Sequence, residues 1–410
     1  MNSQTLFYII ICILLLQYAI DTVLDYLNAR KFNDPIPTEL QGIFDEEEYL
    51  KSQSYKKENY RFSLVNDTFS TLSTLLFLLF GGFNLVDNWV QTITEHSILQ
   101  GLLFFGILMS AASLLSFPFG YYQTFIIEEK FGFNKTSKRT FFKDLLKNGI
   151  LSLILGGVIL FLIFWFLSWA GTYFWLYAWG LLVFLMLFIN LFYTKLIVPI
   201  FNKQSPLEAG SLKNAIEQYA QKVGFNLDNV FVIDGSKRST KSNAYFSGFG
   251  KQKRVTLFDT LINDLNQDEI VAVLAHEVGH YKRNHIIINM IMSILVSGFT
   301  LYILSLFVNT PELSLAIGVE RVSFHAALIG FTLLYSPIST ITSLVLNFLS
   351  RKFEFQADDY AKETYDASPL ISSLKKLSKN NLGNLTPHPL YVIMNYSHPP
   401  LAERIRNLKA

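Results

Sequence analysis

The chain has 410 residues, of which 51% are hydrophobic and only 16% charged, whereas a soluble domain carries about a quarter of charged residues. This composition excludes an ordinary soluble protein and indicates a polytopic membrane protein. The formal net charge of +2 gives no indication of a nucleic-acid partner. The single cysteine, Cys12, excludes a disulfide framework or a cysteine-based zinc site within one chain.

Seven stretches of the sequence are long and apolar enough to cross a bilayer, which needs about 20 apolar helical residues. They are residues 5–24, 64–85, 98–122, 149–169, 173–197, 286–308 and 322–349. The polar loops after the first and third spans are rich in Lys and Arg, and those after the second and fourth contain neither. The positive-inside rule therefore places the N-terminus outside and the C-terminus in the cytoplasm.

Two polar regions, at about residues 201–282 and at 351–410, are large enough to fold, and both lie on the predicted cytoplasmic side. The first combines an amphipathic helix (residues 211–225) with strand-like segments (229–235 and 242–261), the second of which has a Gly-rich middle that predicts a hairpin. The second region reads as helical. The sequence predicts a mainly α fold with a small β-hairpin or sheet. Its expected parts are a membrane domain (1–200), a cytoplasm-facing protease region (201–285), spans six and seven (286–350) and a C-terminal helical region (351–410).

The stretch "VLAHEVGHYKRNH" carries the clearest chemical motif, H-E-x-x-H, formed by His276, Glu277 and His280. On a helix the i, i+4 spacing places both imidazoles on one face, and the glutamate can lean toward a metal-bound water. Asn266 is a plausible N-cap, with Glu269 three residues on. The motif therefore predicts two zinc ligands and a general base on one buried helix.

A third ligand is required, and two candidates exist. His285 lies nine residues after His276, without the glycine that lets a longer motif turn back, so polar packing at the membrane boundary is the favoured interpretation. In "SRKFEFQADDYAKE", Glu354 and Asp358 share a helical face, so Glu354 can reach the metal while Asp358 accepts the spare N–H of a ligating histidine. The alternative is a solvated face beside Lys352 and Lys362.

Seven segments in this order resemble the type I CAAX prenyl endopeptidases, the Ste-type membrane zinc proteases of the gluzincin clan: "EEKFGFNKTS", "SNAYFSGFG", "VTLFDTL", "LAHEVGHYKRNH", "SRKFEFQAD", "NNLGNL" and "YSHPPLAERI". The resemblance extends over nearly the whole chain. It implies seven tilted helices around a water-filled chamber, with a gluzincin-like metalloprotease domain and its zinc near the cytoplasmic side.

The resemblance also implies roles for individual residues. It makes His276, His280 and Glu354 the ligands of one Zn2+ per chain, Glu277 the general base, and Asp358 the partner of a ligating histidine.

Further roles that the resemblance implies concern the substrate. Asn243, Ala244 and Tyr245 match an edge strand that holds the substrate peptide extended. His398 matches a histidine that stabilises the oxyanion, and Arg404 an arginine that supports the site.

The expected activity is peptide hydrolysis by zinc-activated water, near the C-terminus of peptide or protein substrates that carry a prenylated CAAX sequence. The sequence leaves two other functions open: a membrane-protein quality-control metalloprotease of the HtpX type, and a non-catalytic membrane scaffold with a structural zinc. The expected partners are the lipid bilayer and the substrate. Short cytoplasmic loops favour a bacterial inner membrane, with the endoplasmic reticulum membrane as the eukaryotic alternative. The oligomeric state is left open.

Overall fold

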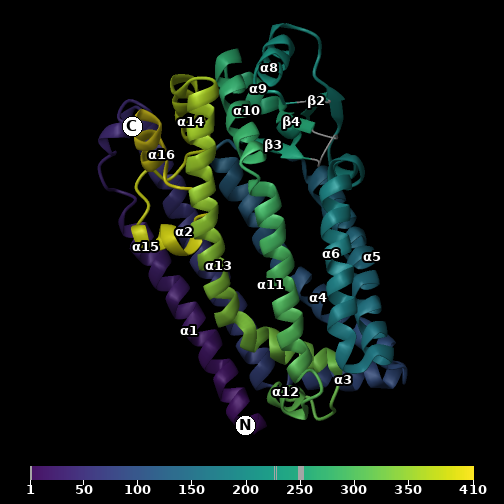
Figure 1. Ribbon diagram of the computed structural model, residues 1–410. Helices are drawn as coiled ribbons and strands as arrows, with labels where there is room; N and C mark the ends of the chain where they lie inside the picture. Colours follow the sequence, from purple (N-terminus) through teal and green to yellow (C-terminus); the bar gives the residue numbers. More distant parts are fainter. Residues whose placement is uncertain (1, 226, 228, 248–253) are drawn as a thin grey trace.

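Long helices run from one end of the molecule to the other in the computed structural model, which describes residues 2–225, 227, 229–247 and 254–410. Figure 1 shows the N-terminus at one end and the C-terminus at the other. Among the described residues, six helical segments are apolar and long enough to cross a membrane. One of them, Lys138–Phe201, turns at Gly171–Tyr173 into two helices that pack side by side. The predicted seven spans are therefore confirmed.

The seven spanning helices form a closed ring. Each contacts the next in the order α1, α2, α4, α5, α6, α11 and α13, and α13 returns to α1. Their bounds are α1 Ser3–Arg30, α2 Glu46–Leu79, α4 Ser97–Tyr122, α5 Lys138–Ala170, α6 Phe174–Phe192, α11 His285–Phe307 and α13 Phe324–Thr364. Only 6–11% of the residues in their most apolar stretches are buried. Besides these contacts between ring neighbours, the start of α13 also contacts α4 and α5, through the Phe104–His325 and Phe164–Phe324 ring pairs.

Three spans differ most from the prediction, and the fourth is one of them, because α5 begins at Lys138 and not at residue 149. The second was expected at residues 64–85, but α2 begins at Glu46, where Asp45 forms a capping box with Glu48. It ends at Leu79 because Gly81 adopts a left-handed conformation (φ 68°), and a short helix, α3 (Gly82–Ile93), follows. The seventh span was expected to end at residue 349, but α13 continues without a break to Thr364. Apolarity marks the membrane part of a helix and does not mark its end.

Smaller elements complete the chain between and beyond the spans. Two π-helical segments, Gln123–Glu128 and Tyr193–Ile197, extend α4 and α6, and the other short helices are α7 Val198–Phe201, α8 Ser211–Lys222, α9 Asp259–Asp264, α12 Pro311–Ala316, α14 Ala367–Asn380, α15 Pro389–Asn395 and α16 Leu401–Lys409.

A small sheet lies at the same end of the molecule as α8, α10 (Gln267–Lys282), α14 and α16 (Figure 1). Within the described residues it has four strands in the order β1-β2-β4-β3: β1 Gln204–Pro206, β2 Asn229–Ile233, β4 Arg254–Phe258 and β3 Ala244–Ser247. β3 and β4 are antiparallel, with Tyr245 opposite Thr256, so the predicted hairpin is confirmed. The Gly-rich turn expected between them, residues 248–253, lies outside the described residues.

The helix α10 is fixed at both ends. At its start Asn266 accepts a hydrogen bond from the Glu269 backbone N–H (2.9 Å), and the Glu269 carboxylate accepts one from the Asn266 N–H (2.8 Å), which confirms the predicted N-cap. Near its end Gly279 packs on α13, where an added Cβ would stand 3.0 Å from the backbone of Ala357. Glycine therefore lets the two helices approach closely, which places the H-E-x-x-H motif beside Glu354.

Candidate metal centre

Three side chains from two helices converge on one point: His276 and His280 from α10 and Glu354 from α13. The two histidine Nε2 atoms lie 3.2 Å apart. His276 Nε2 is 3.5 Å from Glu354 Oε2, and His280 Nε2 is 3.3 Å from Glu354 Oε1. Tetrahedral zinc with bonds near 2.0–2.1 Å needs ligand atoms about 3.3 Å apart. The two nitrogen donors and one carboxylate therefore fit a zinc ion.

An unsatisfied acceptor supports the same conclusion. Glu354 is buried, and its Oε2 has no hydrogen-bond partner among the described residues. A buried carboxylate oxygen without a hydrogen bond is costly. Arg404 Nη1 forms an ion pair with it at 3.4 Å, and a metal ion at the centre would add to that compensation. Of the two sequence candidates for the third ligand, the structure brings Glu354 to the histidine Nε2 atoms. His285 instead lies on the far side of the His280 ring, where its Nδ1 contacts the Nδ1 of His280.

Asp358 and Arg404 hold the outer side of His276. The imidazole Nδ1–H donates to Asp358 Oδ1 at 2.9 Å, and Arg404 donates to both oxygens of the same carboxylate at 2.6 and 2.8 Å. Arg404 also lies 3.4 Å from Glu354 Oε2. His276, Asp358 and Arg404 are all buried. This bidentate pair connects α16 to α13 and fixes the imidazole with its Nε2 directed at the centre.

The electrostatics of His276 suit a cation. Burial by itself lowers the pKa of the imidazole, but hydrogen bonds to Asp358 and Glu354 outweigh that effect and raise the pKa from 6.5 to about 9. The surrounding carboxylates therefore favour a positive charge at this position, which a proton or a metal ion can supply.

Glu277 follows His276 on α10 and belongs to the same electrostatic environment. Removal from water raises the pKa of its carboxyl above 4.5, and the negative charge of Glu354 adds to the rise, while the nearby histidines oppose it. A carboxylate with a raised pKa accepts a proton more readily, which suits a general base that works near neutral pH.

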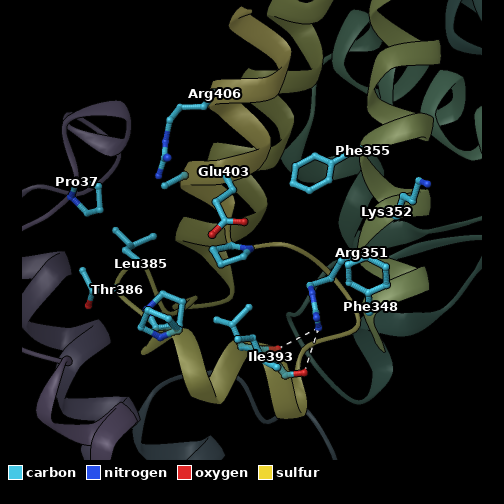
Figure 2. A pocket seen from close by; sticks show the side chains of 15 residues that line it. Pro37, Phe348, Arg351, Lys352, Phe355, Leu385, Thr386, Ile393, Glu403 and Arg406 are labelled. Atoms are coloured by element: carbon cyan, nitrogen blue, oxygen red, sulfur yellow. Dashed lines mark hydrogen bonds between the residues drawn. The ribbon is translucent and has the colours of Figure 1, made fainter. Parts of the chain in front are cut away.

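His398 reaches the centre from the loop between α15 and α16. Its Nε2 lies 3.3 Å from Glu354 Oε1, although most of the side chain is exposed. Arg351 anchors this loop, because its guanidinium donates to the carbonyls of Val392 (3.1 Å) and Tyr396 (2.6 Å) at the end of α15. A cavity of about 610 Å³ lies beside this anchor (Figure 2). None of the three convergent side chains lines that cavity.

The predicted edge strand is also present. β3 is the last strand in the sheet order, so one side of it has no partner strand among the described residues. Ala244 packs on the hydrophobic core that α10 shares with the sheet. Asn243 precedes the strand with an exposed side chain, whose oxygen accepts a hydrogen bond from the Ala244 N–H at 2.8 Å.

Sequence reasoning missed two neighbours of the centre, Gln356 and Phe353, both on α13. Gln356 lies 2.8 Å from His285, and the Phe353 ring stacks on the His285 ring at 4.2 Å. The only signal in the sequence is their spacing around Glu354, which cannot show that His285 lies opposite them.

A ring of membrane-spanning helices with a histidine–histidine–glutamate centre at one end is the arrangement of an integral-membrane zinc metallopeptidase. Residues 206–410 match peptidase family M48, and residues 25–203 match the CAAX prenyl protease N-terminal family with five membrane helices. The chain therefore belongs to the CAAX prenyl protease 1 family of M48 metallopeptidases. This assignment excludes the non-catalytic scaffold and the HtpX-type protease that the sequence left open.

Individual relatives agree with this assignment. CAAX prenyl protease 1 of Saccharomyces cerevisiae is 36% identical, over 96% of this chain and 92% of its own length. The human CAAX prenyl protease 1 homolog is 34% identical, over 91% and 88% respectively. The crystal structure of S. mikatae Ste24p superposes with a TM-score of 0.93 at 33% identity, over 99% of both chains. The fold is thus shared over the whole length.

Proposed function

We propose that this zinc metalloendopeptidase hydrolyses peptide bonds near the C-terminus of prenylated CAAX proteins. The observation that carries the proposal is the convergence of His276, His280 and Glu354 beside Glu277, in a chain whose relatives are named for that substrate. An isoprenoid is apolar and can stay in hydrocarbon while the attached peptide reaches a centre at the end of the spans.

Each residue of the centre has a distinct task in this proposal. One zinc ion per chain, held by His276, His280 and Glu354, would polarise the scissile carbonyl and lower the pKa of the attacking water. Glu277 takes a proton from that water and passes it to the leaving amine.

The supporting residues act on geometry and charge. Asp358 and Arg404 keep the His276 ring oriented, so the ligand does not have to reorganise during the reaction. His398 faces the same space as Glu354 and donates to the oxyanion of the tetrahedral intermediate.

The free edge of β3 holds the substrate. A peptide added alongside Ala244 and Tyr245 extends the sheet through main-chain hydrogen bonds, and the exposed Asn243 amide contacts it at the start of the strand. Main-chain recognition is tolerant of side chains, which suits an enzyme whose substrates share little beyond their C-terminal sequence.

The metal centre faces the cytoplasm in this proposal, with the N-terminus on the other side. The basic loops support this orientation, and the centre and the N-terminus lie at opposite ends of the molecule (Figure 1). Loop length does not separate this chain from its relatives, because the alignment covers 92% of the yeast protein. Since the relatives named above are eukaryotic, they favour the endoplasmic reticulum over the bacterial inner membrane that the sequence analysis favoured.

The test is incubation of the purified protein with a farnesylated CAAX peptide and with its unprenylated counterpart, each with and without chelator. We expect chelator-sensitive cleavage of the farnesylated peptide and slower cleavage of the control. Equal cleavage of both peptides contradicts a requirement for the prenyl group. Cleavage of neither contradicts the proposed substrate.

A further inference from the structure

His285 is the first residue of α11 and is almost completely buried, with 1% of its surface exposed. Only Arg283 and Asn284 separate it from the end of α10, and Asn284 takes a left-handed conformation (φ 59°) that turns the chain between the two helices. Its ring stacks on Phe353 of α13, with the ring planes 11° apart. This histidine is therefore held rigidly where α10, α11 and α13 meet.

Both nitrogens of His285 have partners. Nδ1 lies 3.1 Å from Nδ1 of His280, and Nε2 lies 2.8 Å from Oε1 of Gln356. Two facing nitrogens at this distance share one proton, because two N–H groups would clash and two lone pairs would repel. The contact therefore links the protonation pattern of His280 to that of His285.

The metal centre fixes which nitrogen carries the proton. A ligand nitrogen must offer a lone pair, and the Nε2 atom of His280 is the one that faces His276 and Glu354. The neutral imidazole then carries its proton on Nδ1, and His285 Nδ1 must accept it. His285 in turn carries its own proton on Nε2, where the Gln356 oxygen accepts.

We propose that His285 is a positioning residue, which accepts a hydrogen bond from His280 and so holds that ring in the tautomer and orientation needed for zinc binding. It does for His280 what Asp358 does for His276, with a neutral group in place of a carboxylate. The proposal rests on the ligand role of His280 in the proposed function. It also makes the junction of α10 and α11 part of the centre.

The experiment compares the zinc affinity of His285→Leu and His285→Asn with that of the wild type, by chelator competition on the full chain. Leucine removes the acceptor, whereas the asparagine Oδ1 stands where Nδ1 stood and can still accept. Loss of such an outer partner costs about 10–100-fold in metal affinity. We expect a loss of that size for H285L and recovery to within about threefold of wild type for H285N.

The visible spectrum of the cobalt-substituted protein provides a second readout, because it reports ligand geometry and not stability. We expect a changed spectrum for H285L and a wild-type spectrum for H285N. Wild-type zinc affinity in H285L overturns the proposal. Equal losses in both variants also overturn it, because ring packing on Phe353 would then matter and the acceptor would not.

A measurement on the unmodified sequence covers the case in which H285L does not fold. In the zinc-loaded wild type with ¹⁵N-labelled histidine, NMR distinguishes Nδ1–H from Nε2–H. We expect Nδ1–H for His280 and Nε2–H for His285, and Nδ1–H on His285 overturns the proposal. The ligand set is tested separately by Glu354→Ala, which leaves His285 untouched, so the two proposals can fail independently.

Discussion

Two buried histidine–carboxylate pairs lie at opposite ends of the helical ring, and they differ in one respect. At one end His276 donates to Asp358 at 2.9 Å. At the other, where α3 meets the start of α13, His325 Nε2 lies 2.6 Å from Asp87 Oδ1. Both pairs are buried, so burial and charge alone do not distinguish them.

What distinguishes the two ends is whether the polar atoms already satisfy one another. The second oxygen of Asp87 accepts a hydrogen bond from Gln91 at 2.5 Å, and Gln91 accepts one from Arg321 at 3.1 Å. At the first end a carboxylate oxygen of Glu354 has no hydrogen-bond partner among the described residues, and three ligand atoms converge near it. Convergent atoms that lack hydrogen bonds indicate a binding site, whereas a pair whose hydrogen bonds are complete joins two helices.

The largest expected effect comes from removing the ligand itself. Glu354→Ala removes the only carboxylate of the three convergent groups and should abolish zinc retention, because two histidines alone leave the tetrahedron half filled. Elemental analysis of purified protein measures the result. Asp87→Ala is the matched control at the other end and should keep its zinc. A normal zinc content in Glu354→Ala would remove the distinction between the two ends.

The next effect separates chemistry from binding within the metal centre. Glu277→Gln keeps the size of the side chain but cannot accept a proton, so hydrolysis should fall by roughly 10²–10⁴-fold while the zinc content stays at wild-type level. Peptide cleavage and metal analysis on the same sample measure both quantities. Substantial hydrolysis by this variant means that another group is the base.

The pH dependence of zinc uptake reports the charge at His276. With a pKa near 9, the imidazole of the metal-free protein is protonated at neutral pH, and zinc must displace that proton. Zinc affinity should therefore rise about tenfold for each pH unit up to roughly pH 9 and then level off. Chelator competition across this range measures it. A plateau that begins near pH 6.5 would show that Asp358 and Glu354 do not raise the pKa.

The smallest effect concerns the His325–Asp87 pair, whose hydrogen bonds are complete. Asp87→Ala leaves His325 and Gln91 without their buried partner, which costs about 1–3 kcal/mol of stability. The expected result is a lower melting temperature in detergent, with cleavage per bound zinc unchanged. If catalysis falls while the melting temperature stays the same, this end has a functional role and the comparison fails.

Local features of the sequence predicted much of the molecule. The spans follow from runs of apolar residues, and the start of α10 follows from Asn266 and Glu269, which are close in sequence. The placement of His276 and His280 on one face needs only helical geometry. These features depend on residues within a few turns of one another, so the sequence contains all the information they require.

Contacts between distant segments could not be predicted in the same way. The sheet order β1-β2-β4-β3 includes a parallel β2–β4 pair, which no local pattern indicates. The unbroken course of α13 from the membrane to Glu354 was also missed. Helix ends depend on what the last turns pack against, and here those turns pack on α10 and α16.

The sequence by itself determined that this protein spans the membrane and carries an H-E-x-x-H helix, because both follow from short-range periodicity and composition. Its spacing and its family resemblance also indicated Glu354. Only the tertiary structure decided that Glu354 meets the two imidazoles, that Arg404 locks Asp358 against His276, and that His285 lies against the outer face of His280. The physical reason is that these contacts join helices far apart in the chain, and their distances are set by packing such as that of Gly279 on Ala357.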